Sequence, residues 1–286
     1  MVKGLWFTEL QTPTLALSCK VKETLHREKT PYQELAVLDT EPFGRMLTLD
    51  GVIQTTVGDE FVYHEMITWV ALNTHPCPRR VLIIGGGDGG ALREVLKHPA
   101  VESATLVEID RRVAEVSRQY LPEIALALDD PRAQIRYEDG IVHVREHPAA
   151  YDVIIVDSTD PVGPAEGLFA ATFYEDVHRA LREDGLFVAQ TESPFFNQDL
   201  LGRIYRAVSR VFALCRVYLA CVPTYPGGLW SFTLGSKVYD PLAVEPEMSR
   251  GAATRYYNPA VHRAAFALPN FVRELLDGSA SAGGEE

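Results

Sequence analysis

The chain has 286 residues, which is enough to bury a large core, and its 47% hydrophobic and 23% charged residues are typical of a globular protein. A formal net charge of -12 argues against a nucleic-acid binder, which needs a basic face, and favours cationic ligands. The four cysteines show no CxxC spacing, the first residues lack the apolar core of a signal peptide, and no apolar run could span a bilayer. We therefore expect a soluble, cytoplasmic protein with no membrane or nucleic-acid partner.

The first part of the chain predicts β structure. Residues 33–40 ("QELAVLDT") alternate, residues 44–51 ("GRMLTLDG") end at a turn, and residues 52–57 ("VIQTTV") are β-branched. The first helical pattern, residues 59–76, begins with acids and stops before a proline. We expect a small β domain over residues 1–57, a second domain over 58–275 and a disordered tail over 276–286.

From residue 80 onward, short apolar segments alternate with amphipathic ones. Five strands are predicted at residues 80–85, 103–110, 134–140, 151–158 and 185–192. Four helices are predicted at residues 90–98, 111–121, 172–183 and 197–212. This alternation predicts an α/β fold, with a parallel sheet covered by helices on both faces.

Acidic residues follow each of the first four of these strands, and they are Asp88, Glu108, Asp139, Asp157 and Asp160. In an open α/β sheet, ligands bind outside the carboxyl ends of the strands. A single acid at such an exposed position means little, but five at successive strand ends predict a ligand site with concentrated negative charge.

The glycine-rich segment 85–90 ("GGGDGG") follows the first strand of this series. Gly85, Gly87 and Gly90 satisfy GxGxxG, and Glu108 follows at the distance of about 20 residues at which a carboxylate accepts hydrogen bonds from ribose hydroxyls. An NAD-dependent dehydrogenase is therefore the first alternative. Asp88 argues against it, because a carboxylate inside the loop would face the pyrophosphate at close range.

A nucleoside without phosphates removes that conflict, and a cationic S-adenosyl compound is the natural candidate. Asp139 and Gly140, at the third strand end, would then meet the adenine. An ordinary methyltransferase holds a methionine carboxylate, which Asp88 and Asp157 would repel. A donor that has kept its amine and lost its carboxylate suits the segment 156–164 ("VDSTDPVGP") better.

These segments together resemble the polyamine aminopropyltransferases, and most of all bacterial spermidine synthases. The matching segments, in order, are "YQELAV", "LDGVIQTT", "DEFVYHEM", "GGGDGGALREV", "VEID", "DG", "DSTDPVGPAEGLF", "PTYPGG" and "YYNPAVHRAAFALPNF". The resemblance covers nearly the whole chain. It implies a small N-terminal β domain joined to a methyltransferase-like Rossmann domain, in a homodimer or homotetramer. It also implies transfer of the aminopropyl group of decarboxylated S-adenosylmethionine to putrescine, giving spermidine and methylthioadenosine.

The resemblance also assigns roles to individual residues. By this resemblance, the residues that bind the donor are Gln33, Asp88, Glu108, Asp139, Gly140 and Pro164. The residues that bind the acceptor amine are, by the same resemblance, Tyr63, His64, Asp157, Asp160 and Tyr225. Asp157 matches the proton acceptor of the family, and residues 158–168 match its mobile loop. Position 64 is His in many bacterial members and Gln in animal ones, so the resemblance leaves the protonation state of His64 open.

Several alternatives remain at this stage. The acceptor could be cadaverine, agmatine or a longer polyamine, and the fold also suits an S-adenosylmethionine-dependent methyltransferase or a polyamine sensor without activity. Trp230 could line the acceptor site or belong to the core, and Glu192 could anchor a second cation. The histidines form no metal-ligand spacing with the cysteines or acids, so we expect no metal site and no cofactor beyond the two substrates.

Overall fold

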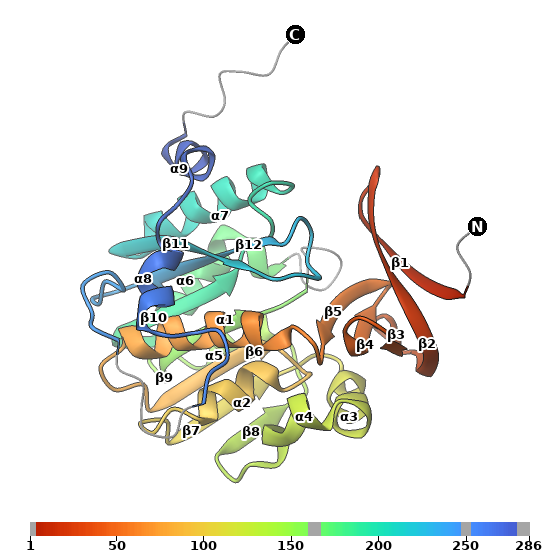
Figure 1. Cartoon of the computed structure of the whole chain (residues 1–286). Coiled ribbons are helices and arrows are strands. Elements are labelled where there is room, and N and C mark those ends of the chain that lie inside the picture. The colour runs from red at the N-terminus through yellow and green to blue at the C-terminus, as the bar shows by residue number, and fades with distance from the viewer. Residues whose placement is uncertain (1–3, 160–166, 247–252, 279–286) are drawn as a thin grey trace.

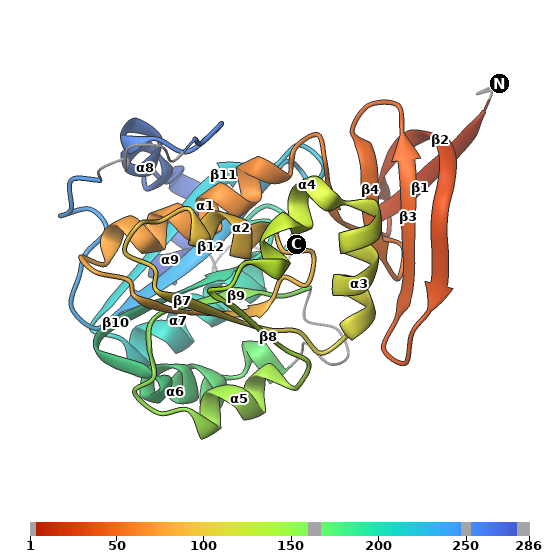
Figure 2. The same cartoon turned by 90° about the horizontal axis from the view of Figure 1, so that it is seen from below.

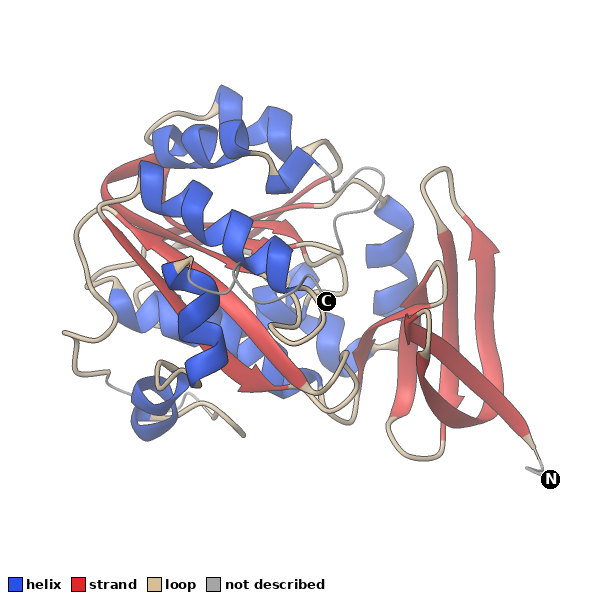
Figure 3. Cartoon of the chain, turned by 90° about the horizontal axis from the view of Figure 1, so that it is seen from above, coloured by secondary structure: helices blue, strands red, loops and turns tan. Residues whose placement is uncertain are grey.

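The computed structural model describes residues 4–159, 167–246 and 253–278, which form two sheets with helices around the larger one (Figure 1). The smaller sheet is an antiparallel meander in chain order. Its strands are β1 (Leu5–Thr12), β2 (Leu15–Lys29), β3 (Glu34–Thr40), β4 (Gly44–Leu49) and β5 (Val52–Thr56). It stands to one side of the helix-covered sheet (Figure 3). The division into domains at residue 57 stays a prediction.

The larger sheet has the strand order β11-β12-β10-β9-β6-β7-β8. Its strands are β6 (Arg80–Gly85), β7 (Ser103–Val107), β8 (Ala133–Arg136), β9 (Tyr151–Asp157), β10 (Leu181–Gln190), β11 (Leu214–Cys221) and β12 (Leu229–Ser236). The strands β6 to β10 pair in parallel, as the alternating pattern predicts. The predicted α/β, Rossmann-like fold is therefore confirmed.

The parallel sheet that the alternation predicts is mixed at one edge. The strands β11 and β12 were not predicted, and β12 runs antiparallel to both β10 and β11. The reason is the short connection 222–228 ("VPTYPGG"), which joins β11 to β12 without a helix and can therefore only form a hairpin.

Helices cover both faces of the larger sheet (Figure 2). They are α1 (Glu60–Thr74), α2 (Gly90–Leu96), α3 (Arg111–Tyr120), α4 (Pro122–Ala125), η1 (Leu126–Asp129), α5 (Gly140–Glu146), α6 (Ala171–Ala180), α7 (Gln198–Val211), α8 (Pro259–Ala265) and α9 (Asn270–Asp277). Alternate residues of β6 enter opposite cores: Val81 packs with α1 and α2, whereas Leu82 packs with α5, α6 and α7. This period of two is what a strand buried on both faces requires.

The two sheets are joined through α3 and α4, which lie between them (Figure 2). Leu35 and Leu47 of the smaller sheet share one apolar cluster with Val116 of α3 and Ile124 of α4. The carboxyl ends of β6, β7 and β9 therefore face the smaller sheet. Of the predicted tail, residues 276 and 277 belong to α9 and residues 279–286 lie outside the described part of the chain.

Helix α1 is buried along almost its whole length and connects the site region to the C-terminal segment. Every residue of α1 except Phe61 and Asn73 is buried. The carboxylate of Glu65, on the side of α1 that meets the C-terminal segment, accepts hydrogen bonds from the backbone amides of Arg255, Tyr256 and Tyr257, each at 2.8 Å. Among the described helices, none is long and apolar enough to cross a membrane.

We expect Glu65→Ala to lower the free energy of unfolding by about 3 kcal/mol, because it leaves three amide donors, the buried one of Tyr257 among them, without their acceptor. Denaturant unfolding of the purified variant measures this. The control is Glu102→Ala, which removes a carboxylate that is 65% exposed. A loss for Glu65→Ala no larger than that of the control would contradict the structural role of this carboxylate.

Candidate active site

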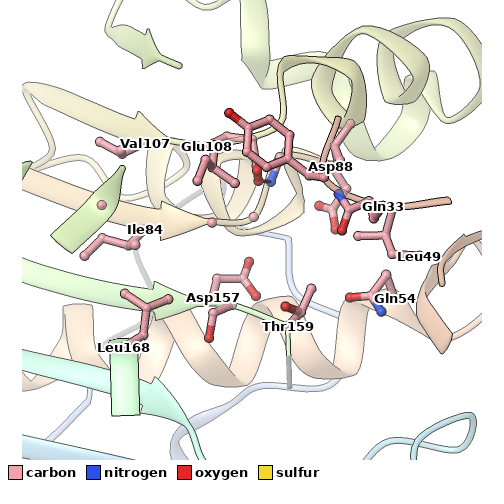
Figure 4. A pocket seen from close by; sticks show the side chains of 18 of the residues that line it. Gln33, Leu49, Gln54, Ile84, Asp88, Val107, Glu108, Asp157, Thr159 and Leu168 are labelled. Atoms are coloured by element: carbon pink, nitrogen blue, oxygen red, sulfur yellow. Dashed lines mark hydrogen bonds between the residues drawn. The ribbon is translucent and has the colours of Figure 1, made fainter. Parts of the chain in front are cut away.

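A cavity of about 360 Å³ lies where the carboxyl ends of β6, β7 and β9 face the smaller sheet (Figure 4). The acidic residues that line it are Asp50, Asp88, Glu108, Asp139 and Asp157. Of the described residues that line it, none is a lysine or arginine, and His64 is the only base. The structure thus brings together four of the five predicted acids. Asp160, like Pro164, lies outside the described residues.

Asp157 ends β9 and holds a carboxylate oxygen without a partner. Its Oδ1 accepts a hydrogen bond from the Tyr63 hydroxyl at 2.7 Å, whereas its Oδ2 is buried and has no hydrogen-bond partner among the described residues. Burial, and then the charge of Asp88, raise the pKa of Asp157 to about 6. Burial also raises the pKa of Tyr63 well above its usual value, so the phenol is a neutral donor. Asp157 is therefore largely ionised at neutral pH and can accept a proton at Oδ2.

The glycine loop allows the acidic side chains to approach the backbone closely. Gly85 and Gly86 have φ values of +79° and +64°, which favour glycine. A Cβ on Gly86 would lie 2.6 Å from Asp157 Oδ2, and one on Gly87 would lie 2.7 Å from Glu108 Oε2. A Cβ on Gly90 would overlap the ring of His64. These glycines make room for protein side chains, so the loop is not reserved for a phosphate.

Glu108 follows β7 and lies across the glycine loop, as its spacing in the sequence predicts. Its Oε2 accepts a hydrogen bond from the Gly87 amide at 3.1 Å, and its Oε1 accepts one from the Asp110 amide at 2.8 Å. Burial nevertheless raises the pKa of Glu108 to about 7. Two backbone donors thus fix the carboxylate beside the cavity, but they do not offset the loss of water around its charge.

Asp88 is paired with a buried histidine. Its Oδ1 accepts a hydrogen bond from the Gly90 amide at 2.7 Å and lies 3.5 Å from His64 Nε2. The other ring nitrogen, His64 Nδ1, lies 2.6 Å from Glu60 Oε2. Burial alone would lower the pKa of His64, but the two carboxylates outweigh it and hold this pKa well above its usual value. His64 is therefore an imidazolium whose two nitrogens both face carboxylates, and its predicted contact with the acceptor stays a prediction.

The remaining predicted donor residues line the same cavity. Asp139 caps α5, its Oδ1 accepting a hydrogen bond from the Ile141 amide at 2.7 Å. Gly140 follows it, and a Cβ there would overlap the side chain of Ile84. Gln33 reaches the cavity from the loop between β2 and β3. These residues come from two separate places in the chain, the start of α5 and the loop between β2 and β3.

A second cavity of about 40 Å³ adjoins the first and shares Tyr63 and Tyr225 with it. The ring of Tyr225 lies 5.4 Å from that of Tyr63 and 4.7 Å from that of Trp230, between centroids. Trp230 Nε1 is buried without a partner in the described part of the chain. The two cavities thus lie next to each other, with the rings of Tyr63 and Tyr225 lining both.

The second cavity also contains residues that the sequence did not predict. Glu9 of β1 is 4% exposed, and its Oε2 accepts a hydrogen bond from the Ile53 amide at 2.9 Å. Gln190, at the end of β10, lines the same cavity. In the sequence, Glu9 is in phase with Phe7 along β1, but the polar Gln11 follows in the same phase, so the pattern does not single Glu9 out. Glu192 lines neither cavity, and its Oε2 accepts a hydrogen bond from Asn197 Nδ2 at 3.0 Å.

The described residues contain no group of three or more His, Cys, Asp or Glu side chains that could hold a metal ion. The candidate site is therefore built from carboxylates, aromatic rings and backbone amides.

The raised pKa of Glu108 predicts a pH-dependent stability of the ligand-free protein. This pKa rises from 4.5 to about 7 on folding, so between these values the folded chain holds a proton that the unfolded chain has lost. Stability should therefore fall as the pH rises through this range, by about 3 kcal/mol for this group. Denaturant unfolding between about pH 5 and pH 8 measures it, and Glu108→Gln should remove this share of the dependence while Asp157 and His64, whose pKa values are also raised, keep theirs. An identical pH dependence in wild type and variant would show that Glu108 is not buried as described.

Comparisons with known proteins identify the family of the chain. Residues 60–243 match the family model of the spermine/spermidine synthase domain, and residues 5–57 match that of the spermidine synthase tetramerisation domain. The chain is 64% identical over 276 residues to a polyamine aminopropyltransferase of Moorella thermoacetica, covering 96% of this chain and 98% of the relative. It is 62% identical over 270 residues to one of Desulforudis audaxviator, covering 94% and 98%.

Two solved structures are also similar. A spermidine synthase in complex with the transition state analogue AdoDATO has a TM-score of 0.93 and 44% identity, covering 96% of this chain and 95% of that one. The spermidine synthase of Thermotoga maritima has a TM-score of 0.92 and 43% identity, with the same coverage. The chain belongs to the spermine/spermidine synthase family.

Proposed function

We propose that the protein transfers the aminopropyl group of decarboxylated S-adenosylmethionine to putrescine, giving spermidine and methylthioadenosine. One observation carries the proposal: Asp157 holds an ionisable, unpartnered Oδ2 inside a cavity with four further acids and, among its described residues, no lysine or arginine. Such a site attracts cations and can take a proton from one of them. Polyamine aminopropyltransferase is also the name of the relatives described above.

In this proposal the donor lies along the carboxyl ends of β6 and β7. Glu108 accepts hydrogen bonds from the ribose hydroxyls, and Asp139 with Gly140 lies at the adenine. Asp88 attracts the donor's ammonium, an interaction of up to about 4 kcal/mol near a protein surface. A donor that keeps its carboxylate would meet Asp88 and Asp157 with the wrong charge, which disfavours the methyltransferase alternative.

The acceptor amine attacks the carbon next to the sulfonium sulfur. A primary amine has a pKa near ~10.4, so holding one neutral at pH 7 costs roughly 4.6 kcal/mol in water. Asp157 Oδ2 takes the proton as the nitrogen–carbon bond forms and the carbon–sulfur bond breaks, and the bonding electron pair leaves on sulfur as a neutral thioether. Holding nitrogen, carbon and sulfur in line can contribute up to about 7–11 kcal/mol.

The second cavity fits the distal end of the acceptor. The methylene chain lies between Tyr63 and Tyr225, whose rings also favour a cation, and the distal ammonium lies beside Glu9. A space of about 40 Å³ suits an ammonium better than the larger, planar guanidinium of agmatine. Putrescine is therefore preferred to agmatine, and cadaverine is the closest competitor.

The smaller sheet supports the proposed assembly. The tetramerisation domain model matches residues 5–57, and β1 and β2 expose Leu5, Trp6, Leu10 and Leu15. We place the contact between subunits on these strands, in a homodimer or homotetramer. All four cysteines are free, which agrees with the reducing cytoplasm.

The direct test of the function offers the purified protein decarboxylated S-adenosylmethionine with putrescine, cadaverine or agmatine as sole acceptor. We expect spermidine and methylthioadenosine from putrescine, with lower kcat/KM for the other two amines, because the distal cavity fits a short diamine. Mass spectrometry identifies the products. Methylated amines formed from S-adenosylmethionine, without any aminopropylated product, would overturn the proposal.

Asp157→Asn should lower kcat by about 10²–10⁴-fold, because the amide that replaces the carboxylate cannot take the proton. Its dissociation constant for methylthioadenosine should stay within about threefold of wild type, since binding of the nucleoside does not need a proton acceptor at this position. In the wild type, kcat should fall below about pH 6 as Asp157 becomes protonated. The control is Asp129→Asn, a change at a carboxylate that is 76% exposed. Turnover near the wild-type rate in Asp157→Asn would exclude this role.

A further inference from the structure

Asp110 is a buried carboxylate that the mechanism above does not use, and it joins the two sheets behind the donor site. It caps α3, with Oδ1 accepting a hydrogen bond from the Arg112 amide at 3.0 Å. Its Oδ2 accepts two hydrogen bonds from the loop between β2 and β3, from Thr30 Oγ1 at 2.7 Å and from Gln33 Nε2 at 2.9 Å. The side chain is 1% exposed.

These contacts decide which way the Gln33 amide faces. An ionised carboxylate only accepts hydrogen bonds, so the NH₂ group of Gln33 must turn toward Asp110 and the carbonyl oxygen must turn away from it. Gln33 lines the donor cavity (Figure 4). We propose that Asp110 is a positioning residue for the reaction: it fixes the Gln33 amide so that this side chain offers the donor nucleoside a hydrogen-bond acceptor. This inference rests on the proposed function, because it requires a nucleoside in the cavity.

Asp110→Asn tests the orientation with little other change. Asparagine caps helices as well as aspartate does, and its oxygen will stay on the Arg112 amide because the NH₂ group there would set two donors against each other. The backbone amide of Asp110 that binds Glu108 Oε1 is unaffected. The new NH₂ group therefore takes the place of Oδ2.

The two partners of Oδ2 respond differently to that group. The oxygen of the Thr30 hydroxyl already accepts from the backbone amides of Tyr32 and Gln33, each at 3.1 Å, but its O–H can turn from Oδ2 and donate to the backbone carbonyl oxygen of Gln33 at 3.2 Å. The Gln33 side chain has no such choice, since two NH₂ groups would face each other. Its amide must turn over and present NH₂ to the cavity, so the group of the nucleoside that donates to the carbonyl oxygen loses its acceptor.

We expect Asp110→Asn to raise the dissociation constant of methylthioadenosine, measured by calorimetry, about tenfold, which is the loss of one hydrogen bond. The KM for putrescine at saturating donor should stay within about twofold of wild type. A general loss of structure would change both values, and thermal unfolding of the variant checks for it.

The reciprocal change separates orientation from mere packing. Gln33→Glu alone sets two carboxylates against each other and should weaken methylthioadenosine binding at least as much. In the double variant Asp110→Asn/Gln33→Glu, the new glutamate accepts from the asparagine with one oxygen and presents the other to the nucleoside. Binding should then return to within about threefold of wild type, which a structural role for either residue does not predict.

Two results would overturn the inference: a dissociation constant of Asp110→Asn within twofold of wild type, or a double variant as weak as the sum of the single changes. The proposed function fails separately. If the wild type binds neither methylthioadenosine nor decarboxylated S-adenosylmethionine, both proposals fall. If the wild type binds them and the double variant does not recover, only the role of Asp110 is wrong.

Discussion

The structure depends on one costly arrangement: several carboxylates lie at the edge where two sheets meet, and the described residues around the cavity supply only one cation to balance them. The raised pKa values of Glu108 and Asp157 are a direct sign of that cost, because burial disfavours their charged forms. Asp88 differs, since His64 lies beside it and lowers its pKa against the effect of burial. His64 lies 2.6 Å from Glu60 but 3.5 Å from Asp88, so Asp88 is compensated only in part and adds to the negative charge of Glu108 and Asp157. Cationic substrates can supply the compensation that the protein lacks.

Helix α1 is the element that keeps this arrangement rigid. Toward the cavity it presents Tyr63 and His64, and on another side Glu65 holds the C-terminal segment through three backbone amides. Just before the helix, Asp59 accepts hydrogen bonds from the Thr224 amide and hydroxyl at 3.0 and 2.8 Å. Thr224 precedes Tyr225 in the chain, so these bonds fix the loop that carries the second tyrosine. Tyr63 and Tyr225, whose rings line both cavities, are thus both held in place by α1 and the residue before it.

The sequence predicted the parts of the site that depend only on the order of the elements. Asp88, Glu108 and Asp157 each follow a strand of one parallel series, and the carboxyl ends of parallel strands meet at one edge. The positions of Glu9 and Gln190 depend instead on how the smaller sheet packs beside β10 and β12, which no local pattern determines. The strand β12 does alternate between apolar and polar residues over 230–235, but β11 does not, and the hairpin was missed.

The protonation states of individual side chains could not be predicted from the sequence either. His64 becomes an imidazolium only because Glu60, one turn earlier, and Asp88, in a different element, both face its ring. Likewise, spacing identified Glu108 but did not show that burial would raise its pKa. Asp110 was overlooked because a helix-capping aspartate is common, and its contact with Gln33 spans 77 residues of sequence. Such roles depend on tertiary contacts and need coordinates.

The central claim is that the cavity is an anionic slot for two cations, and the most direct measurement compares two donors that differ by one carboxylate. Calorimetry at low salt gives the dissociation constants of decarboxylated and intact S-adenosylmethionine for the wild type and for Asp88→Asn. The account predicts that the wild type binds the decarboxylated compound at least about 100-fold more tightly, which corresponds to about 3 kcal/mol of repulsion avoided, and that Asp88→Asn loses much of this preference. Equal affinity of the wild type for the two compounds would contradict it.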